Sequence, residues 1–132
     1  MCGIAGFTGD QQDDLIERMT ECILHRGPDD FGYFKDNDIT FGLRRLSIID
    51  IKGGHQPMST TDGNITIIFN GEIYNYKELR KDLLKRGVSF RTNSDTEILL
   101  RSYKEYGLNC LQKFNGMFAF AIWDKREKKL IL

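Results

Sequence analysis

The sequence has little of what several classes of protein depend on. Its 132 residues include three cysteines, two histidines and two prolines. Cys2, Cys22 and Cys110 form no CxxC spacing, so the pattern predicts neither a disulfide scaffold nor a zinc site. With only His25 and His55 available as imidazole ligands, we expect no metal centre. No apolar run approaches the ~20 residues of a membrane span and no charged-then-apolar leader is found, so we expect a soluble, cytoplasmic protein with no membrane partner.

An excess of charge of one sign is also missing. Lysine plus arginine and aspartate plus glutamate each number 19, which gives a formal net charge of zero. The two signs are interleaved, as in residues 124–129, rather than gathered on one element. The sequence therefore predicts no nucleic-acid partner. Its length predicts a single domain over residues 1–132.

Short apolar runs alternate with amphipathic stretches along the chain. Runs rich in apolar and β-branched residues predict strands, and apolar residues spaced three and four apart predict helices. Two helices open on a capping-box spacing, Asn75 with Glu78 and Ser94 with Glu97. The predicted strands are residues 2–8, 32–35, 39–46, 65–69, 117–123 and 129–132, and the predicted helices are residues 13–24, 75–87 and 94–107, with a short helical turn at 108–114 and a long loop at 47–63.

Two of the three cysteines fall on predicted apolar faces. Cys22 shares the stripe of the first helix with Ile16 and Met19, and Cys110 lies in the short helical turn. Both are predicted to pack in the core as small apolar side chains. The chain ends in the middle of a predicted strand, residues 129–132, so we expect the sheet to continue in a longer parent protein.

Cys2 is placed differently, directly behind the initiator methionine. A small side chain at position 2 favours enzymatic removal of Met1, which leaves Cys2 with a free α-amino group. A thiol has an ordinary pKa near ~8.5 and an α-amino group one near ~7.7–8.0. The amine can then take the thiol proton near neutral pH, so one residue supplies both nucleophile and base. The alternative is that Cys2 is a small core residue.

A thiol nucleophile that attacks an amide needs hydrogen-bond donors for the developing oxyanion. Asn70 and Gly71 follow a buried run, and they offer a side-chain NH₂ and a backbone N–H. Such a donor is typically worth ~10²–10³ in rate. The alternative is an Asn-Gly turn between two strands.

Charged residues elsewhere suit the two ends of an amino acid. Arg45, at the end of a predicted strand, is suited to bind a carboxylate through two parallel hydrogen bonds, although Arg44 and Arg45 also read as a solvated pair. Glu72 and Asp95 are suited to bind an ammonium group, although an acid at Asp95 is also favoured by the helix dipole. Together these groups predict one substrate, an amino acid with a side-chain amide.

Seven short motifs then carry a resemblance over essentially the whole chain. The chain resembles the glutaminase domain of class II glutamine amidotransferases, which are N-terminal nucleophile hydrolases, and within them the glutamine-hydrolysing asparagine synthetase branch. Related sugar-phosphate and purine-precursor amidotransferases share the Cys2 start but not the third and fourth motifs. The motifs are Met1-Cys2-Gly3-Ile4-Ala5-Gly6, His25-Arg26-Gly27-Pro28-Asp29-Asp30, Arg45-Leu46-Ser47-Ile48-Ile49-Asp50, Gly54-His55-Gln56-Pro57-Met58, Phe69-Asn70-Gly71-Glu72-Ile73-Tyr74-Asn75, Ser94-Asp95-Thr96-Glu97 and Asn115-Gly116-Met117-Phe118-Ala119-Phe120-Ala121.

The resemblance implies an α+β fold, a four-layer αββα sandwich with mostly antiparallel sheets that is incomplete at its C-terminus. It implies hydrolysis of the glutamine side-chain amide through a γ-glutamyl thioester, which needs no cofactor. The ammonia supplies a synthetase domain, the partner, which uses ATP and Mg to amidate aspartate. The implied roles are nucleophile for Cys2, oxyanion donors for Asn70 and Gly71, carboxylate binding for Arg45, α-amino binding for Glu72 and Asp95, and backbone contacts near Leu46 and Ile48.

Two departures from the family bear on this reading. Leu43 stands where many relatives have histidine, and no essential role follows from that position. The synthetase domain and its Ser-Gly-Gly-x-Asp phosphate loop are missing from the 132 residues, so we expect this chain not to make asparagine by itself. The alternative hypothesis is therefore a non-catalytic fragment that keeps the fold and binds glutamine or a synthetase partner without turnover.

Overall fold

The computed structural model describes residues 2–10, 12 and 14–132. Ten helices and strands and two short 3₁₀ helices follow one another through these residues. In chain order they are β1 (Gly3–Thr8), α1 (Leu15–Cys22), η1 (Leu24–Arg26), β2 (Asp30–Lys35), β3 (Ile39–Arg45), β4 (Met58–Ser59), β5 (Ile65–Ile73), α2 (Tyr76–Lys85), α3 (Asp95–Tyr106), η2 (Gly107–Lys113), β6 (Gly116–Asp124) and β7 (Lys129–Ile131).

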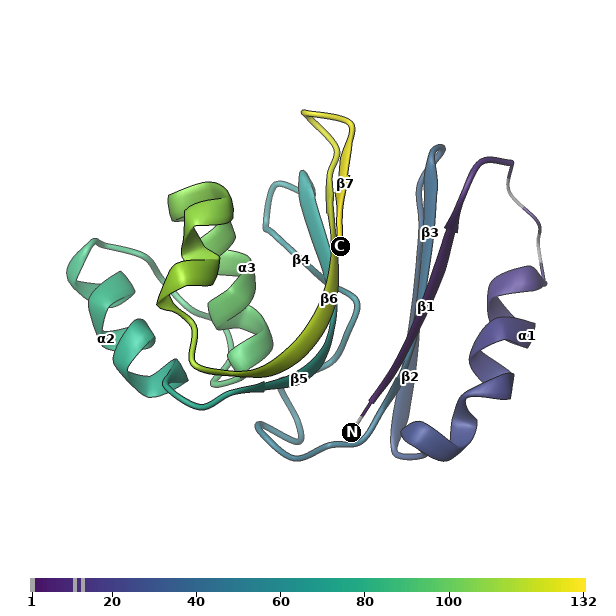
Figure 1. The fold of residues 1–132 in the computed structure, drawn as a ribbon, viewed down its shortest axis with the longest axis horizontal. Helices are drawn as coiled ribbons and strands as arrows, with labels where there is room; N and C mark the ends of the chain where they lie inside the picture. Colours follow the sequence, from purple (N-terminus) through teal and green to yellow (C-terminus); the bar gives the residue numbers. More distant parts are fainter. Residues whose placement is uncertain (1, 11, 13) are drawn as a thin grey trace.

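The strands form two antiparallel sheets that face each other. One sheet has the order β1-β3-β2 and the other the order β4-β5-β6-β7. Helix α1 lies outside the first sheet, and α2 and α3 lie outside the second (Figure 1). Strand β1 begins at the lower end of the view, on the side of its sheet that faces the second sheet's lower end. The predicted α+β fold with four layers, αββα, is confirmed.

Alternation of side chains along the strands builds the core between the sheets. Ile39, Phe41 and Leu43 of β3 point to the second sheet and are at most 1% exposed. They meet Ile68 of β5 and Trp123 of β6, and Cys2 packs against the same cluster. Because strand side chains alternate, the residues between them on β3 face the other way, towards α1.

Helix α1 covers that outer face closely because of a glycine. A Cβ at Gly42 would lie 2.6 Å from Cγ2 of Thr20, so a larger residue in β3 would push the helix away. Thr20 and Ile16 are fully buried in this contact, whereas Cys22 is exposed. The predicted core role of Cys22 is therefore wrong, because the helix turns its Ile16 and Thr20 face to the sheet and leaves Cys22 on the solvent side. The predicted start of this helix at Asp13 lies outside the described residues.

A second core lies between the β4–β7 sheet and its helices. Its buried members come from β4, β5, β6, α3 and η2, and they include Ile67, Leu99 and Cys110. The core prediction for Cys110 is confirmed, and burial raises the pKa of its thiol to about 11. No helix among residues 2–10, 12 and 14–132 is long and apolar enough to cross a membrane.

Strand β5 extends further than predicted. It does not end before Asn70 and Gly71 but continues to Ile73, with Asn70 opposite Ala119 and Gly71 opposite Phe118 of β6. The alternative interpretation of Asn70-Gly71 as a hairpin turn is thereby wrong. The two-residue strand β4 was also not predicted, because two paired residues inside a long loop leave no periodic signal.

Both predicted capping boxes lie at helix starts, but only Ser94 forms a side-chain cap hydrogen bond. Ser94 caps α3 by accepting a hydrogen bond from the Thr96 N–H at 3.0 Å, while Glu97 does not reach back to it. The Glu97 carboxylate instead accepts from the N–H groups of Arg91 and Thr92. Asn75 makes no cap hydrogen bond with α2, because its amide binds the Lys113 carbonyl and the Asn115 N–H. The side chain thus joins two segments far apart in sequence.

Candidate active site

One pocket of about 150 Å³ lies where the ends of β3, β5 and α3 converge beside Cys2. The segments around it come from both sheets, from the loop after β3 and from the first turn of α3. Seven of the eight residues singled out in the sequence line it, Asn70 being the exception. The full lining is Cys2, Arg45, Leu46, Ile48, Ile49, Phe69, Gly71, Glu72, Tyr74, Ser94, Asp95, Thr96 and Met117.

Cys2 stands just before β1, at the end of the inter-sheet core. Its side chain is half-buried, and Sγ lies 3.7 Å from the Leu46 carbonyl oxygen, a long contact typical of a weak S–H donor. Its backbone carbonyl accepts a hydrogen bond from Nε of Arg26 at 3.4 Å. The thiol therefore has one face on the core and the other on the pocket. Met1, whose removal was predicted, lies outside the described residues.

The hydrogen bonds on the side of β5 that faces β4 show which way the Gly71 N–H points. The N–H of Ile65 donates to Thr60 Oγ1, that of Phe69 to Gln56 Oε1, and that of Ile73 to Asp95 Oδ2. Backbone groups alternate along a strand, so Gly71 directs its N–H to this same edge, between two side-chain acceptors. No side-chain acceptor stands opposite it among the described residues, and Gly71 lines the pocket.

Only glycine fits at position 71. Its φ is 155°, and a Cβ built there would run into the backbone of Met117 and Phe118 on β6. The close packing of β5 on β6 therefore requires a residue without a side chain. That absence also lets a ligand approach the backbone N–H directly.

Asn70 lies beside the pocket rather than in its lining. By strand alternation its side chain shares the inter-sheet face with Ile68, whose cluster includes Cys2. Its Oδ1 is buried, and no group among the described residues forms a hydrogen bond with it. Buried polar atoms are nearly always paired, so this side-chain amide has unused hydrogen-bonding capacity on the side of Cys2.

Arg45 is buried, with 5% of its side chain exposed, and it holds the loop that follows it. Its Nη1 donates to the Ile51 carbonyl at 3.0 Å, and its Nη2 donates to the carbonyls of Ile49 and Asp50 at 3.1 and 2.9 Å. These bonds leave Nε–H and one hydrogen on Nη1 for other acceptors. The alternative of a solvated pair is wrong for Arg45, and it also fails for Arg44, whose side chain is 12% exposed in its ion pair with Glu21.

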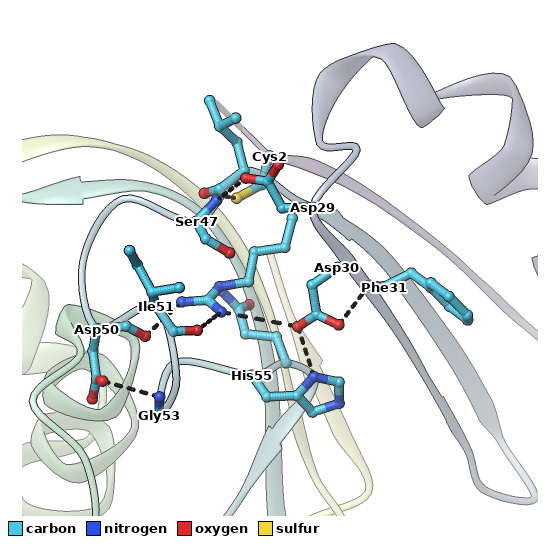
Figure 2. Close-up of polar contacts among 12 residues, drawn as sticks. Cys2, Asp29, Asp30, Phe31, Ser47, Asp50, Ile51, Gly53 and His55 are labelled. Atoms are coloured by element: carbon cyan, nitrogen blue, oxygen red, sulfur yellow. Dashed lines mark hydrogen bonds and ion pairs between the residues drawn. The ribbon is translucent and has the colours of Figure 1, made fainter.

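Residues of three motifs, which come from two distant parts of the sequence, meet around this loop (Figure 2). Asp29 accepts a hydrogen bond from the Ser47 N–H at 2.8 Å. Asp30 contacts Nδ1 of His55 at 2.8 Å and lies 3.9 Å from Nη1 of Arg45. The two acids at the start of β2 therefore hold both ends of the 47–55 segment, so the loop has a defined course around the pocket.

Two carboxylates give the opposite side of the pocket a negative charge. Asp95, at the start of α3, is 5% exposed and accepts from the Ile73 N–H at 3.1 Å. Burial raises the pKa of Asp95, and the charge of Glu72 raises it further. Two acids that repel each other in a buried site favour a cation between them, because the cation relieves both the repulsion and the loss of solvation. This region suits an ammonium group.

Sequence reasoning missed several residues of the pocket. Tyr74 and Met117 line its mouth and are 55% and 60% exposed, and Thr96 lies beside Asp95. Each lies close to a residue that was predicted from its chemistry, as Met117 lies opposite Glu72 in the sheet. Only the folded chain shows these contacts, so the sequence carries no signal for them. Among the residues described, no group of three or more histidine, cysteine, aspartate or glutamate side chains could hold a metal ion.

The arrangement defines a class of protein. The fold is similar to that of a solved structure, the glutamine phosphoribosylpyrophosphate amidotransferase of Bacillus subtilis. The match has a TM-score of 0.57 and 27% identity, and it covers 68% of this chain and 22% of that one. The fold is therefore that of the N-terminal nucleophile amidotransferases.

The chain belongs to the glutamine amidotransferase domain family, whose profile matches residues 1–132. It is 50% identical to asparagine synthetase [glutamine-hydrolyzing] 1 of Bacillus subtilis, over 98% of this chain and 22% of that protein. It is 36% identical to asparagine synthetase [glutamine-hydrolyzing] 1 of Arabidopsis thaliana, over 100% of this chain and 23% of that protein. The chain thus spans about a fifth of the length of these curated relatives.

Proposed function

We propose that this domain hydrolyses the side-chain amide of glutamine with Cys2 as the nucleophile. The observation that carries the proposal is that Cys2 and Gly71 line one small pocket together with the carboxylates Glu72 and Asp95. A nucleophile, an oxyanion donor and an ammonium site are the parts that attack on an amino-acid amide needs. Membership of the glutamine amidotransferase family supports glutamine over other amides.

Binding comes first. The α-ammonium group of glutamine lies between Glu72 and Asp95, and no cation in the described part of the chain forms an ion pair with either carboxylate. Its α-carboxylate accepts from Arg45 through the N–H groups that the loop carbonyls leave free. Backbone groups near Leu46 and Ile48 line the same side. This pose directs the amide end of the side chain towards Cys2.

The chemical step then proceeds in two halves. The α-amino group of Cys2, free once Met1 is removed, takes the thiol proton as Sγ bonds to the amide carbon. The amide oxygen gains the negative charge and accepts from the Gly71 N–H and from the Asn70 side chain, whose NH₂ replaces Oδ1 after a half-turn of the amide. The C–N bond breaks, the nitrogen takes the proton and ammonia leaves. Water then adds to the γ-glutamyl thioester, the C–S bond breaks, and glutamate and the thiol are released.

The use of the ammonia lies outside these 132 residues. The relatives are named glutamine-hydrolysing asparagine synthetases, and they extend well beyond the part that this chain matches. We infer that the ammonia passes to a synthetase domain that binds ATP and Mg and amidates aspartate. The glutaminase step itself uses none of these groups.

The intact mass of the protein tests the proposal, before and after reaction with an electrophilic glutamine analogue. Cys22 is exposed and would react with general thiol reagents, so the experiment is run in a Cys22→Ser background. We expect a mass that lacks one methionine, one adduct on Cys2, and protection by excess glutamine. Cys2→Ala should abolish both the adduct and glutamate release while the protein stays folded. A processed, folded protein without the adduct would instead support the non-catalytic alternative.

A further inference from the structure

The edge of β5 beside the pocket is completed by a side chain instead of a strand. Strand β4 pairs Ser59 with Thr66 and Met58 with Ile67, and the same register brings Gln56 opposite Phe69. Strand β4 covers only Met58 and Ser59, so its backbone pairing with β5 does not reach Gln56. The backbone groups of Phe69 on this edge need other partners.

Gln56 supplies both partners through its side chain. Its Oε1 accepts from the Phe69 N–H at 2.7 Å, and its Nε2 donates to the Phe69 carbonyl at 3.2 Å. The second hydrogen on Nε2 is directed to Oγ1 of Thr96 on α3, also at 3.2 Å. Gln56 is 3% exposed, so its amide is buried and uses each of its groups. A fully satisfied buried network of this kind is rigid.

This contact is next to the donors that the reaction requires. Phe69 directly precedes Asn70 and Gly71, and Ile73 on their other side is held by Asp95. The N–H of Gly71, which has no hydrogen-bond acceptor among the residues that the structure describes, therefore lies between two residues of the same strand edge that side chains hold in place. We propose that Gln56 is a positioning residue, which aims the Asn70–Gly71 donor pair at the oxyanion by fixing Phe69; the proposal rests on the glutaminase function proposed above.

Loss of the Gln56 amide should weaken stabilisation of the transition state more than it weakens substrate binding. Without the amide, Phe69 bonds water and the strand edge shifts. A shift of about 1 Å costs about 10²-fold in rate, because the donors no longer meet the oxyanion. The groups proposed to bind the α-ammonium and α-carboxylate lie outside this contact, so the KM for glutamine should stay nearly constant.

The test compares Gln56→Met, which keeps the length of the side chain without its polar atoms, with Gln56→Asn, which keeps the amide but is one methylene shorter. Ser59→Ala is the matched control, because it removes the Ser59–Thr66 side-chain bond farther along the same β4–β5 pair. We expect each Gln56 variant to lower kcat ~10–100-fold with KM changed less than ~3-fold. Ser59→Ala should leave both constants unchanged.

Two further readouts separate positioning from general loosening. An aldehyde analogue of glutamine adds to the thiolate and forms a tetrahedral oxyanion, so its inhibition constant should rise by the factor by which kcat falls. Alkylation of Cys2 by iodoacetamide forms no oxyanion, so its rate in the Cys22→Ser background should not change. If kcat falls only in proportion to the loss of thermal stability, or if both readouts change together, Gln56 is merely structural and the proposal is wrong.

Failure of the proposed function itself gives a different result, since the wild-type protein would then release no glutamate. If neither Gln56 variant folds, hydrogen exchange in the wild-type protein decides. The Phe69 amide should exchange as slowly as its neighbours in β5, and the aldehyde should slow exchange at Gly71 alone. Fast exchange of the Phe69 amide hydrogen in the free protein would show that Gln56 does not hold Phe69 in place, and the proposal would be wrong.

Discussion

The two sheets contribute to the pocket in different ways. The β1-β3-β2 sheet brings Cys2 and Arg45. The buried Arg45 holds the middle of the loop beyond this sheet, whereas both ends of the loop are held by exposed contacts, those of Asp29 with Ser47 and of Asp30 with His55. The β4-β5-β6-β7 sheet brings Gly71, and its edge is held by buried contacts.

The difference teaches where precision is needed. Exposed hydrogen bonds and ion pairs are weak and exchange readily with water, so the ends of this loop are held less tightly than the edge of β5. Buried polar contacts are costly to break, so they keep an oxyanion donor in place. We therefore expect changes on the β5 side to have larger effects than changes on the loop side.

The largest effect is expected for Gly71→Ala. The new Cβ meets the backbone of β6, so the strands must separate and the donor N–H moves. We expect a loss of ~10²–10³ in kcat together with a clear loss of thermal stability. The control is Gly63→Ala, where φ is also positive, at 69°, but nothing lies within 4 Å. Equal effects of the two variants would show that backbone strain alone is responsible.

A large effect on stability, but not directly on chemistry, is expected for Glu97→Gln. Burial alone would raise the pKa of Glu97, but hydrogen bonds from Arg91, Thr92 and Arg101 hold it below its ordinary value. Removing the charge leaves Arg101 buried without its partner, which costs about 3–5 kcal/mol.

The pH dependence of this effect follows from the sign of the shift. A lowered pKa means that Glu97 stabilises the fold above its unfolded-state pKa and that this contribution is lost as pH falls through its folded-state pKa. Urea unfolding of both proteins should therefore show the largest gap near neutral pH and convergence in acid. Glu105→Gln, on the same helix but in an exposed pair with Arg86, should change stability by less than ~1 kcal/mol. A gap that persists in acid would contradict the assignment.

Asp95→Asn should change binding more than folding. The amide oxygen still accepts from the Ile73 N–H, while the charge proposed to attract the α-ammonium is lost. A hydrogen bond to a charged group contributes ~1.5–3 kcal/mol, so we expect KM to rise ~10–100-fold. Because the pKa of Asp95 is raised, the wild-type KM should also increase as the carboxyl becomes protonated in acid, and the KM of the variant should not. Asp82→Asn, at an exposed site on α2, serves as the charge control.

The smallest effect is expected for His55→Ala. Its contact with Asp30 is exposed, with 60% of the His55 side chain accessible to solvent. Exposed ion pairs contribute ~0.2–1 kcal/mol, so kcat/KM and the free energy of unfolding should change little. Steady-state kinetics and urea unfolding measure both. A loss of kcat as large as that for Gly71→Ala would mean that the two sides of the pocket are equally rigid.

The sequence by itself determined most of the strands and helices, although it missed β4 and the second half of β5. The periodic spacing of apolar residues and the helix-ending glycines Gly87 and Gly107 are local signals. It also determined which residues to examine for chemistry, since Cys2, Gly71, Glu72 and Asp95 were chosen by residue type and by resemblance. Seven of the eight chosen residues then line one pocket, although their roles remain predictions.

Only the tertiary structure decided how these residues are held and which others join them. Cys22 matched an apolar stripe, yet the face that α1 turns to Gly42 left it exposed. Asn75 matched a cap, yet Lys113 and Asn115 took its hydrogen bonds. Gln56 carried no local signal, because its partner Phe69 is 13 residues away and is reached only when β4 pairs with β5. Local patterns record what a residue prefers, whereas a buried hydrogen bond depends on which distant group the fold brings within reach.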